Sequence, residues 1–135
     1  MRQVFTSDSA PQPRGSYSQV IRAGQLVFTA GFGPVDPATD QNIGDTIEEQ
    51  TARVLDNVEA ALAAAGCGLR DVVKVTAHLA DLKRDFAGYD AVYRSRMVAP
   101  FQVRTTVGSQ LMDILVEIDV VAVVPDAPDE QPGIA

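Results

Sequence analysis

The chain has 135 residues, a formal net charge of −7, one histidine and one cysteine. This length predicts one domain that can bury a core without disulfides, and the single cysteine excludes a disulfide within the chain. The net negative charge argues against non-specific binding of nucleic acid. One histidine and one cysteine are too few for a dedicated zinc site.

Segments that would direct the chain to or through a membrane are not evident. Hydrophobic residues make up 46% of the chain, but no uninterrupted run is long enough for a transmembrane helix. Residues 1–20 contain no apolar segment of the kind that secretory signals have. Together with the single cysteine, these features lead us to expect a cytoplasmic protein.

The first part of the chain predicts three short strands. Residues 4–8 can form the first, and residues 16–31 predict a β-hairpin with Ala23 and Gly24 at its turn. Residues 32–45 follow as a loop rich in glycine, proline and aspartate.

Residues 45–66 carry the clearest helical pattern. Asp45 and Glu48 have the spacing of a capping box, and Gly66 stands where a C-terminal cap belongs. Small and apolar residues recur on one face of this helix, at Ile47, Thr51, Val54, Leu55, Val58, Ala61, Leu62 and Ala65. This face is expected to pack on the core.

The remaining elements are a strand at residues 69–81, a helix at 84–97 and two strands at 101–108 and 113–124. The order β-β-β-α-β-α-β-β favours an α+β two-layer sandwich, in which two helices pack on one face of a mostly antiparallel sheet. We expect residues 1–125 to form this single domain. Residues 126–135 are acidic and rich in proline, so we expect a disordered tail there.

The last strand has two different faces. One face is purely apolar and should lie under the helices: Val116, Ile118, Val120, Ala122 and Val124. The other mixes apolar side chains with two carboxylates: Leu115, Glu117, Asp119, Val121 and Val123. A fully solvated face does not need these apolar residues, so a second copy of the chain is expected to cover it. The alternative is an ordinary half-exposed sheet.

Arg104 interrupts a short β-branched strand. If the last two strands pair, Arg104, Glu117 and Asp119 lie near one another. Two interpretations then remain open. Arg104 is a structural ion-pair partner, or its planar fork stays free to bind the carboxylate of a small anionic ligand.

The sequence around Arg104 resembles a known family. RTTVG at 104–108 followed by LVEIDVVAV at 115–123 is similar to the C-terminal signature of the RidA (YjgF) family. The resemblance extends through residues 15–39, 48–66 and 71–93, so it covers nearly the whole chain. It implies a chorismate-mutase-like α+β fold and a homotrimer with its sites between subunits.

The activity that the resemblance implies is hydrolytic deamination of reactive enamine and imine acids, such as 2-aminoacrylate and 2-iminopropanoate. The products are a 2-oxo acid and ammonia. No metal or other cofactor is expected, because an imine is already electrophilic. Positioning of the substrate and delivery of water supply much of the acceleration.

The resemblance also implies roles for individual residues. Arg104 matches the arginine that anchors the substrate carboxylate, and Glu117 matches the acid that positions or activates water. Gly31 lies in a turn whose backbone approaches the ligand. The positions expected to bind substrate are Tyr17, Gly31, Phe32, Asp90 and Thr106.

Several of these positions depart from the family pattern. Thr106 replaces a cysteine, Asp90 an asparagine, Ala30 a serine, Gln102 a proline, and Phe32 a polar residue. The loop between the signature arginine and glutamate is also shorter. The arginine and glutamate themselves are retained, so a relative with another substrate, such as an aminomuconate-like enamine, stays open.

Three functions compete on the sequence alone. An imine deaminase is favoured, because a second negative charge at Glu117 would hinder simple binding of an anion. A small-carboxylate-binding protein without turnover is the alternative. A ribonuclease is least favoured, since the chain is acidic and its nearest basic cluster is expected on a solvated helix face: Lys83, Arg84, Arg94 and Arg96.

Three further residues are given structural roles. Cys67 is expected to be a partly buried small residue after the first helix. His78 shares a strand face with Lys74 and Thr76, where it can line the interior of a trimer. Asp119 is interpreted as an interface carboxylate.

Overall fold

The computed structural model describes residues 1–126, so the predicted tail lies almost wholly outside the described residues. The helices are α1 (Ile47–Ala64) and α2 (Leu82–Arg96), with a 3₁₀ turn, η1, at Leu69–Asp71. The strands are β1 (Arg2–Phe5), β2 (Val20–Ala23), β3 (Leu26–Thr29), β4 (Val35–Asp36), β5 (Gln41–Asn42), β6 (Val72–Leu79), β7 (Val103–Gly108) and β8 (Val116–Val123).

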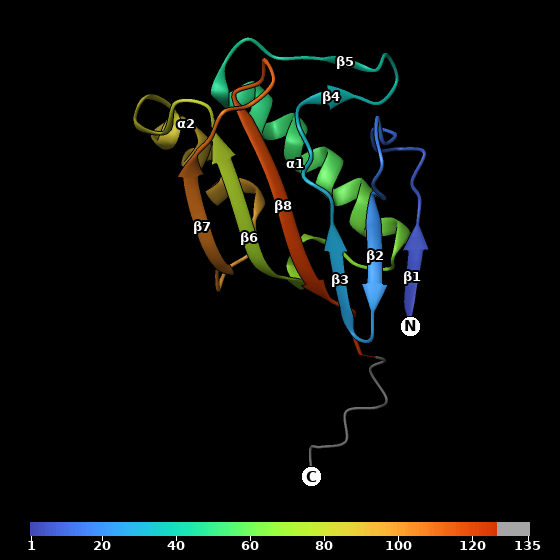
Figure 1. The fold of residues 1–135 in the computed structure, drawn as a ribbon. Coiled ribbons are helices and arrows are strands. Elements are labelled where there is room, and N and C mark those ends of the chain that lie inside the picture. The colour runs from blue at the N-terminus through green and yellow to red at the C-terminus, as the bar shows by residue number, and fades with distance from the viewer. Residues whose placement is uncertain (127–135) are drawn as a thin grey trace.

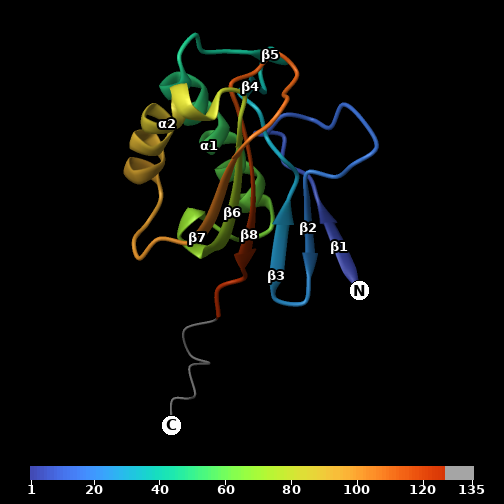
Figure 2. The ribbon, with the colours of Figure 1, turned by 60° about the vertical axis from the view of Figure 1, so that its left-hand side comes forward.

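Six of the strands form one sheet in the order β1-β2-β3-β8-β6-β7, and β4 and β5 form a separate short hairpin. Both helices cover the same face of the sheet (Figures 1 and 2), which confirms the predicted α+β architecture. Every pairing in the sheet is antiparallel except β6 with β7. Neither helix in residues 1–126 combines the length and apolar character needed to cross a membrane.

Some predicted boundaries shift by a few residues. The first strand ends at Phe5 rather than residue 8, because Phe5 pairs with Val20 and the partner strand begins there. The last strand but one starts at Val103 rather than residue 101, where it first pairs with β6 at Lys74. Phe101 precedes it in the connection from α2 and is exposed.

The packing face of α1 matches the predicted helical pattern. All eight residues predicted for that face are buried. The capping box is one residue later than predicted. Thr46 accepts a hydrogen bond from the Glu49 amide, and the Glu49 carboxylate accepts one from the Thr46 amide. Gly66 follows the helix with φ +80°, a conformation that favours glycine.

The segment β6-α2-β7 determines where Arg104 lies. A strand joined through a helix to the next strand returns parallel to the first, so β7 pairs with β6. β8 pairs with the other edge of β6. The last two strands are therefore not neighbours, so the condition under which Arg104 would lie near Glu117 and Asp119 is not met.

The two faces of β8 differ as predicted. Val116, Ile118, Val120 and Ala122 are 0–2% exposed beneath the helices. On the opposite face, the side chains are half-buried or exposed: Leu115, Glu117, Asp119, Val121 and Val123. We call this second side of the sheet the open face.

Candidate functional site

Arg104 lies on the helix-covered side of the sheet, at its β7 edge. It is in register with Val75, which is fully buried beneath the helices. Its guanidinium carbon is 4.5 Å from the ring centroid of Tyr93 and 5.5 Å from that of Tyr89. These cation–π contacts with α2 hold the charged group at the edge of the core.

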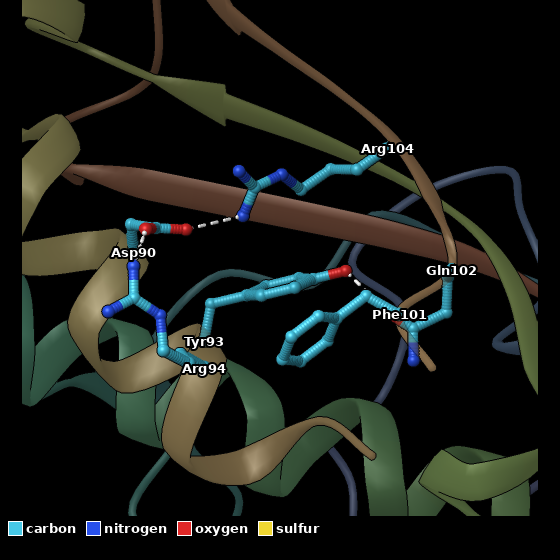
Figure 3. Close-up of a pocket in the computed structure, with 6 residues that line it drawn as sticks. All are labelled: Asp90, Tyr93, Arg94, Phe101, Gln102 and Arg104. Carbon is cyan, nitrogen blue, oxygen red and sulfur yellow. Dashed lines mark hydrogen bonds and ion pairs between the residues drawn. The ribbon is translucent and has the colours of Figure 1, made fainter. Parts of the chain in front are cut away.

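One side of the Arg104 guanidinium is occupied and the other is available. Its Nη1 donates a hydrogen bond to Oδ1 of Asp90 at 2.8 Å (Figure 3). Within residues 1–126, the one side-chain hydrogen bond with good geometry from this guanidinium goes to Asp90. Burial raises the pKa of the nearby Tyr89, and the positive charge of Arg104 partly offsets this effect. The Nε–Nη2 edge has the geometry that binds a carboxylate through two parallel hydrogen bonds.

Asp90 lies on α2 between two arginines. Its Oδ1 accepts from Arg104, and its Oδ2 accepts from Nη2 of Arg94 at 2.9 Å. The hydrogen bond from Arg104 is the main cause that lowers the pKa of Asp90, and the positive charges of both arginines lower it further against the effect of burial. Asp90 is therefore ionised at neutral pH.

A cavity of about 390 Å³ opens beside these groups. Its lining residues are Asp90, Tyr93, Arg94, Phe101, Gln102 and Arg104 (Figure 3). The Tyr93 hydroxyl donates to Oε1 of Gln102 at 2.7 Å. Burial, followed by the effect of Tyr89, raises the pKa of Tyr93 to about 12, so this hydroxyl keeps its proton. We call this cavity the arginine cavity.

Glu117 lies in a different cavity, on the open face. This glutamate cavity has a volume of about 470 Å³ and is lined by Tyr17, Ser18, Ile21, Phe28, Thr29, Ala30, Gly31 and Glu117. A neighbouring hollow of about 240 Å³ shares Tyr17, Gly31 and Glu117, and Phe32 also lines it. The structure thus brings together four of the predicted site residues.

Gly31 and Phe32 place the backbone against Glu117. Phe32 exchanges two backbone hydrogen bonds with Ile118, at 2.9 and 3.1 Å, and its side chain is only 5% exposed. This bridge sets Gly31 beside Glu117. A β-carbon on Gly31 would lie 2.6 Å from Oε2 of Glu117, so only glycine fits without displacing the carboxylate.

Tyr17 and Thr106 lie in different surroundings. Tyr17 is half-exposed, and its hydroxyl accepts from the backbone N–H of Arg14 at 3.2 Å. Thr106 is on the helix-covered side of β7, and its hydroxyl is 3.2 Å from that of Tyr89. Within one chain, Thr106 belongs with Arg104, and Tyr17 belongs with Glu117.

Arg104 and Glu117 do not meet within one chain. β6 separates their strands, and they lie on opposite sides of the sheet. The cross-strand neighbour of Glu117 is His78, and that of Asp119 is Thr76. Within one chain, Arg104 therefore pairs with neither Glu117 nor Asp119, and its ion-pair partner is Asp90.

The open face carries a further set of titratable groups. Nδ1 of His78 lies 2.8 Å from Oγ of Ser109. Burial raises the pKa of Asp119, and electrostatic interactions with His78 and Lys74 partly offset this effect. The predicted shared strand face of Lys74 and His78 is confirmed.

Two polar residues of α1, which the sequence analysis did not single out, hold the loops beside Glu117. Nδ2 of the fully buried Asn57 donates to the carbonyls of Gly33 and Val35 at 3.0 and 2.8 Å. Oε1 of Gln50 accepts from the backbone N–H of Leu115 at 2.8 Å. Their signal was a polar residue on an otherwise apolar helix face, which usually has a buried partner.

The basic residues of α2 are largely paired. Arg84 contacts Asp85, and Arg96 contacts Asp56 and Glu59, in addition to the contact of Arg94 with Asp90. Cys67 is buried, and its Sγ lies 3.9 Å from the carbonyl oxygen of Val123. Within residues 1–126, no group of three histidine, cysteine, aspartate or glutamate side chains is placed to hold a metal ion.

Known proteins resemble this chain over nearly its whole length. Residues 7–124 match the family model described as Endoribonuclease L-PSP. The chain is 41% identical over 124 residues to a RutC family protein of Pyrococcus horikoshii, covering 90% of this chain and 98% of that protein. It is 35% identical over 123 residues to Reactive Intermediate Deaminase A, chloroplastic, of Arabidopsis thaliana, covering 90% of this chain and 65% of that protein.

A solved structure extends the similarity to the fold. The crystal structure of E. coli TdcF with bound serine matches this chain with a TM-score of 0.83 at 31% sequence identity. The match covers 90% of this chain and 98% of that one.

Proposed function

The chain belongs to the RidA (YjgF) family, and on that premise we propose that it hydrolyses small carboxylated enamines and imines to a 2-oxo acid and ammonia. The observation that carries the proposal is the free edge of Arg104. Stacking on Tyr93 and a hydrogen bond to Asp90 fix the guanidinium, while Nε and Nη2 remain available for a substrate carboxylate. The bound serine of the E. coli relative, a small α-amino acid, supports a carboxylated ligand of this size.

Glu117 supplies the second half of the proposed site. Water adds to the imine carbon to give a carbinolamine, which then expels ammonia to leave the 2-oxo acid. Water must lose a proton and the nitrogen must gain one. Glu117, held against the Gly31 backbone in an open cavity, is the group that relays this proton.

The two halves require a second subunit. Arg104 lies at the β7 edge of the sheet, whereas Glu117 lies on the open face. If the β7 edge of one chain packs beside the glutamate cavity of the next, one arginine and one glutamate share a cleft. This supports a homotrimer with sites between subunits, and the half-buried apolar residues of the open face supply the interface. Sedimentation at micromolar concentration should give three times the chain mass of 14.4 kDa, and a stable monomer would contradict this.

RNA is a less suitable substrate. The chain carries a net charge of −7, and the arginines of α2 are engaged with aspartates and glutamates. An RNA-binding surface needs free positive charge to displace the counterions of the phosphate backbone.

The assay that tests the proposal generates 2-aminoacrylate or 2-aminocrotonate in situ and follows the loss of the imine signal. The wild-type protein should accelerate this loss, and Arg104→Ala should not. Lys83→Gln, which removes a positive charge from the exposed start of α2, is the matched control. If wild type binds a 2-oxo acid but accelerates no small imine, the protein is a carboxylate binder and the deaminase proposal fails.

A further inference from the structure

We propose that Arg94 sets the affinity of Arg104 for its carboxylate ligand by holding Asp90 away from the free edge of Arg104. Arg94 is thus a positioning residue that acts through Asp90. The inference rests on the proposed role of Arg104 as the carboxylate anchor. It concerns a residue pair, Asp90 and Arg94, that shares the arginine cavity.

The geometry separates the two oxygens of Asp90. Oδ1 binds Nη1 of Arg104 and Oδ2 binds Nη2 of Arg94, so each oxygen has its own guanidinium (Figure 3). Asp90 therefore makes only one hydrogen bond to Arg104. A carboxylate that faces an arginine without a competitor prefers the bidentate arrangement. Arg94 prevents this arrangement by occupying the second oxygen.

The consequence for the ligand is direct. If Asp90 were released, its two oxygens would compete with the ligand carboxylate for the N–H groups of Arg104. Arg94 is positioned to hold it, because it lies one helical turn after Asp90 on α2, with an i, i+4 spacing that favours such pairs. Its own side chain is 70% exposed, whereas those of Asp90 and Arg104 are 21% and 24% exposed.

Charge acts in the same direction. Arg104, Asp90 and Arg94 together carry one net positive charge, which favours an anion in the arginine cavity. Without Arg94 the positive charge of Arg104 is cancelled by Asp90. An asparagine at position 90 would bond to Arg104 without this cancellation, and would then have no need of Arg94. Asp90 and Arg94 thus form a charge-balanced pair.

The test is a double-mutant cycle measured with a stable ligand. Pyruvate affinity is determined by calorimetry for wild type, Arg94→Ala, Asp90→Asn and the double variant. Arg94→Ala should weaken binding roughly three- to tenfold, the scale of a partly exposed charge pair. Asp90→Asn should bind more tightly than wild type, because the amide keeps the hydrogen bond to Arg104 and removes a negative charge. Removing Arg94 from the Asp90→Asn protein should weaken binding less than removing it from wild type. Lys83→Gln, the control for loss of one positive charge from α2, should bind like wild type.

A second measurement does not depend on ligand binding. Phenylglyoxal modifies accessible arginines, and mass spectrometry reports the rate at Arg104. The modification rate at Arg104 should fall in Arg94→Ala, because the released Asp90 can cover the Nε–Nη2 edge. The rate should rise in Asp90→Asn. If wild type binds no pyruvate, the anchor role of Arg104 fails, while the modification rates still decide whether Arg94 acts through Asp90.

Two results would overturn the inference. The first is an Arg94→Ala variant in which both the pyruvate affinity and the Arg104 modification rate equal those of wild type. The second is an equal loss of affinity on removing Arg94 in the Asp90→Asn background, since Arg94 would then act on the ligand directly.

Discussion

Gly31 leaves no room for a side chain beside Glu117, because a β-carbon at residue 31 would lie 2.6 Å from the carboxylate oxygen Oε2. The backbone bridge between Phe32 and Ile118 fixes this approach, so the two segments cannot move apart without losing paired hydrogen bonds. The Gly31 backbone therefore lies directly beside the Glu117 carboxylate and limits the space on that side.

A methyl group at Gly31 should displace the Glu117 carboxylate and slow imine hydrolysis by roughly 10- to 100-fold, the scale of a misplacement of about 1 Å. The change is measured by the imine-loss assay with Gly31→Ala. Gly68→Ala is the control, because the nearest atom to a β-carbon there is 4.0 Å away. Unchanged hydrolysis in Gly31→Ala would show that the position of Glu117 is unimportant.

Arg104→Lys should weaken binding of a 2-oxo acid by about 10- to 100-fold, because lysine keeps the charge but loses the planar fork that pairs with a carboxylate. Calorimetry with pyruvate measures the loss, and circular dichroism checks the fold. Lysine also cannot reproduce the stacking of the guanidinium on Tyr93. Equal affinity in the two proteins would mean that the carboxylate binds elsewhere.

Local periodicity in the sequence was sufficient to predict most of the fold. The buried face of α1 and the two faces of β8 follow from spacings of 3.6 and 2 residues, which burial in any two-layer sandwich requires. The capping box shifted by one residue, to Thr46 and Glu49, because neighbouring acidic residues offered two equivalent spacings. Such boundaries depend on backbone angles that the sequence pattern does not specify.

Strand adjacency was the main feature that the sequence analysis left open, although the sequence did contain a signal for it. A strand, a helix and a strand in succession form a parallel unit, so β7 had to pair with β6. That arrangement separates Arg104 from Glu117. The contacts of Asp90 with Arg94 also had a local signal in their i, i+4 spacing. By contrast, the contact of Gly31 with Glu117 depends on the bridge at Phe32, which joins segments far apart in the chain.

Asp119→Asn should stabilise the protein at neutral pH. Burial raises the pKa of Asp119 in the folded state, so between the unfolded and folded pKa values the folded protein binds more protons. The free energy of unfolding therefore falls as pH rises through this window. The melting temperature of Asp119→Asn should exceed that of wild type at pH 7. The difference should shrink as pH falls through the window between the folded and unfolded pKa values, and should be absent below the unfolded pKa of about 3.9.

The control for Asp119→Asn is Asp8→Asn, which removes a negative charge from an exposed position. It should not reproduce the gain at pH 7. If Asp119→Asn lowers the melting temperature at pH 7, the carboxylate is stabilised by a partner in the assembled protein.

Glu117→Gln should reduce imine hydrolysis by roughly 10²–10⁴, the usual contribution of a general acid–base group. The amide has nearly the same shape, so the contact with Gly31 should persist. Pyruvate affinity should hold or improve, because one negative charge facing the ligand is removed. Hydrolysis within a few-fold of wild type would assign a structural role to Glu117 and place water activation elsewhere.

Mixed subunits test whether Arg104 and Glu117 reach the same site from different chains. Arg104→Ala and Glu117→Gln should each be inactive as homotrimers. When the two are unfolded together and refolded in equal amounts, about a quarter of the sites should combine an intact arginine from one chain with an intact glutamate from the next, as random closed assembly requires. Imine hydrolysis should therefore recover to about a quarter of the wild-type rate. Each variant refolded alone is the control. If the site lay within one chain, no mixed assembly would contain both intact residues in one site, and activity would not return.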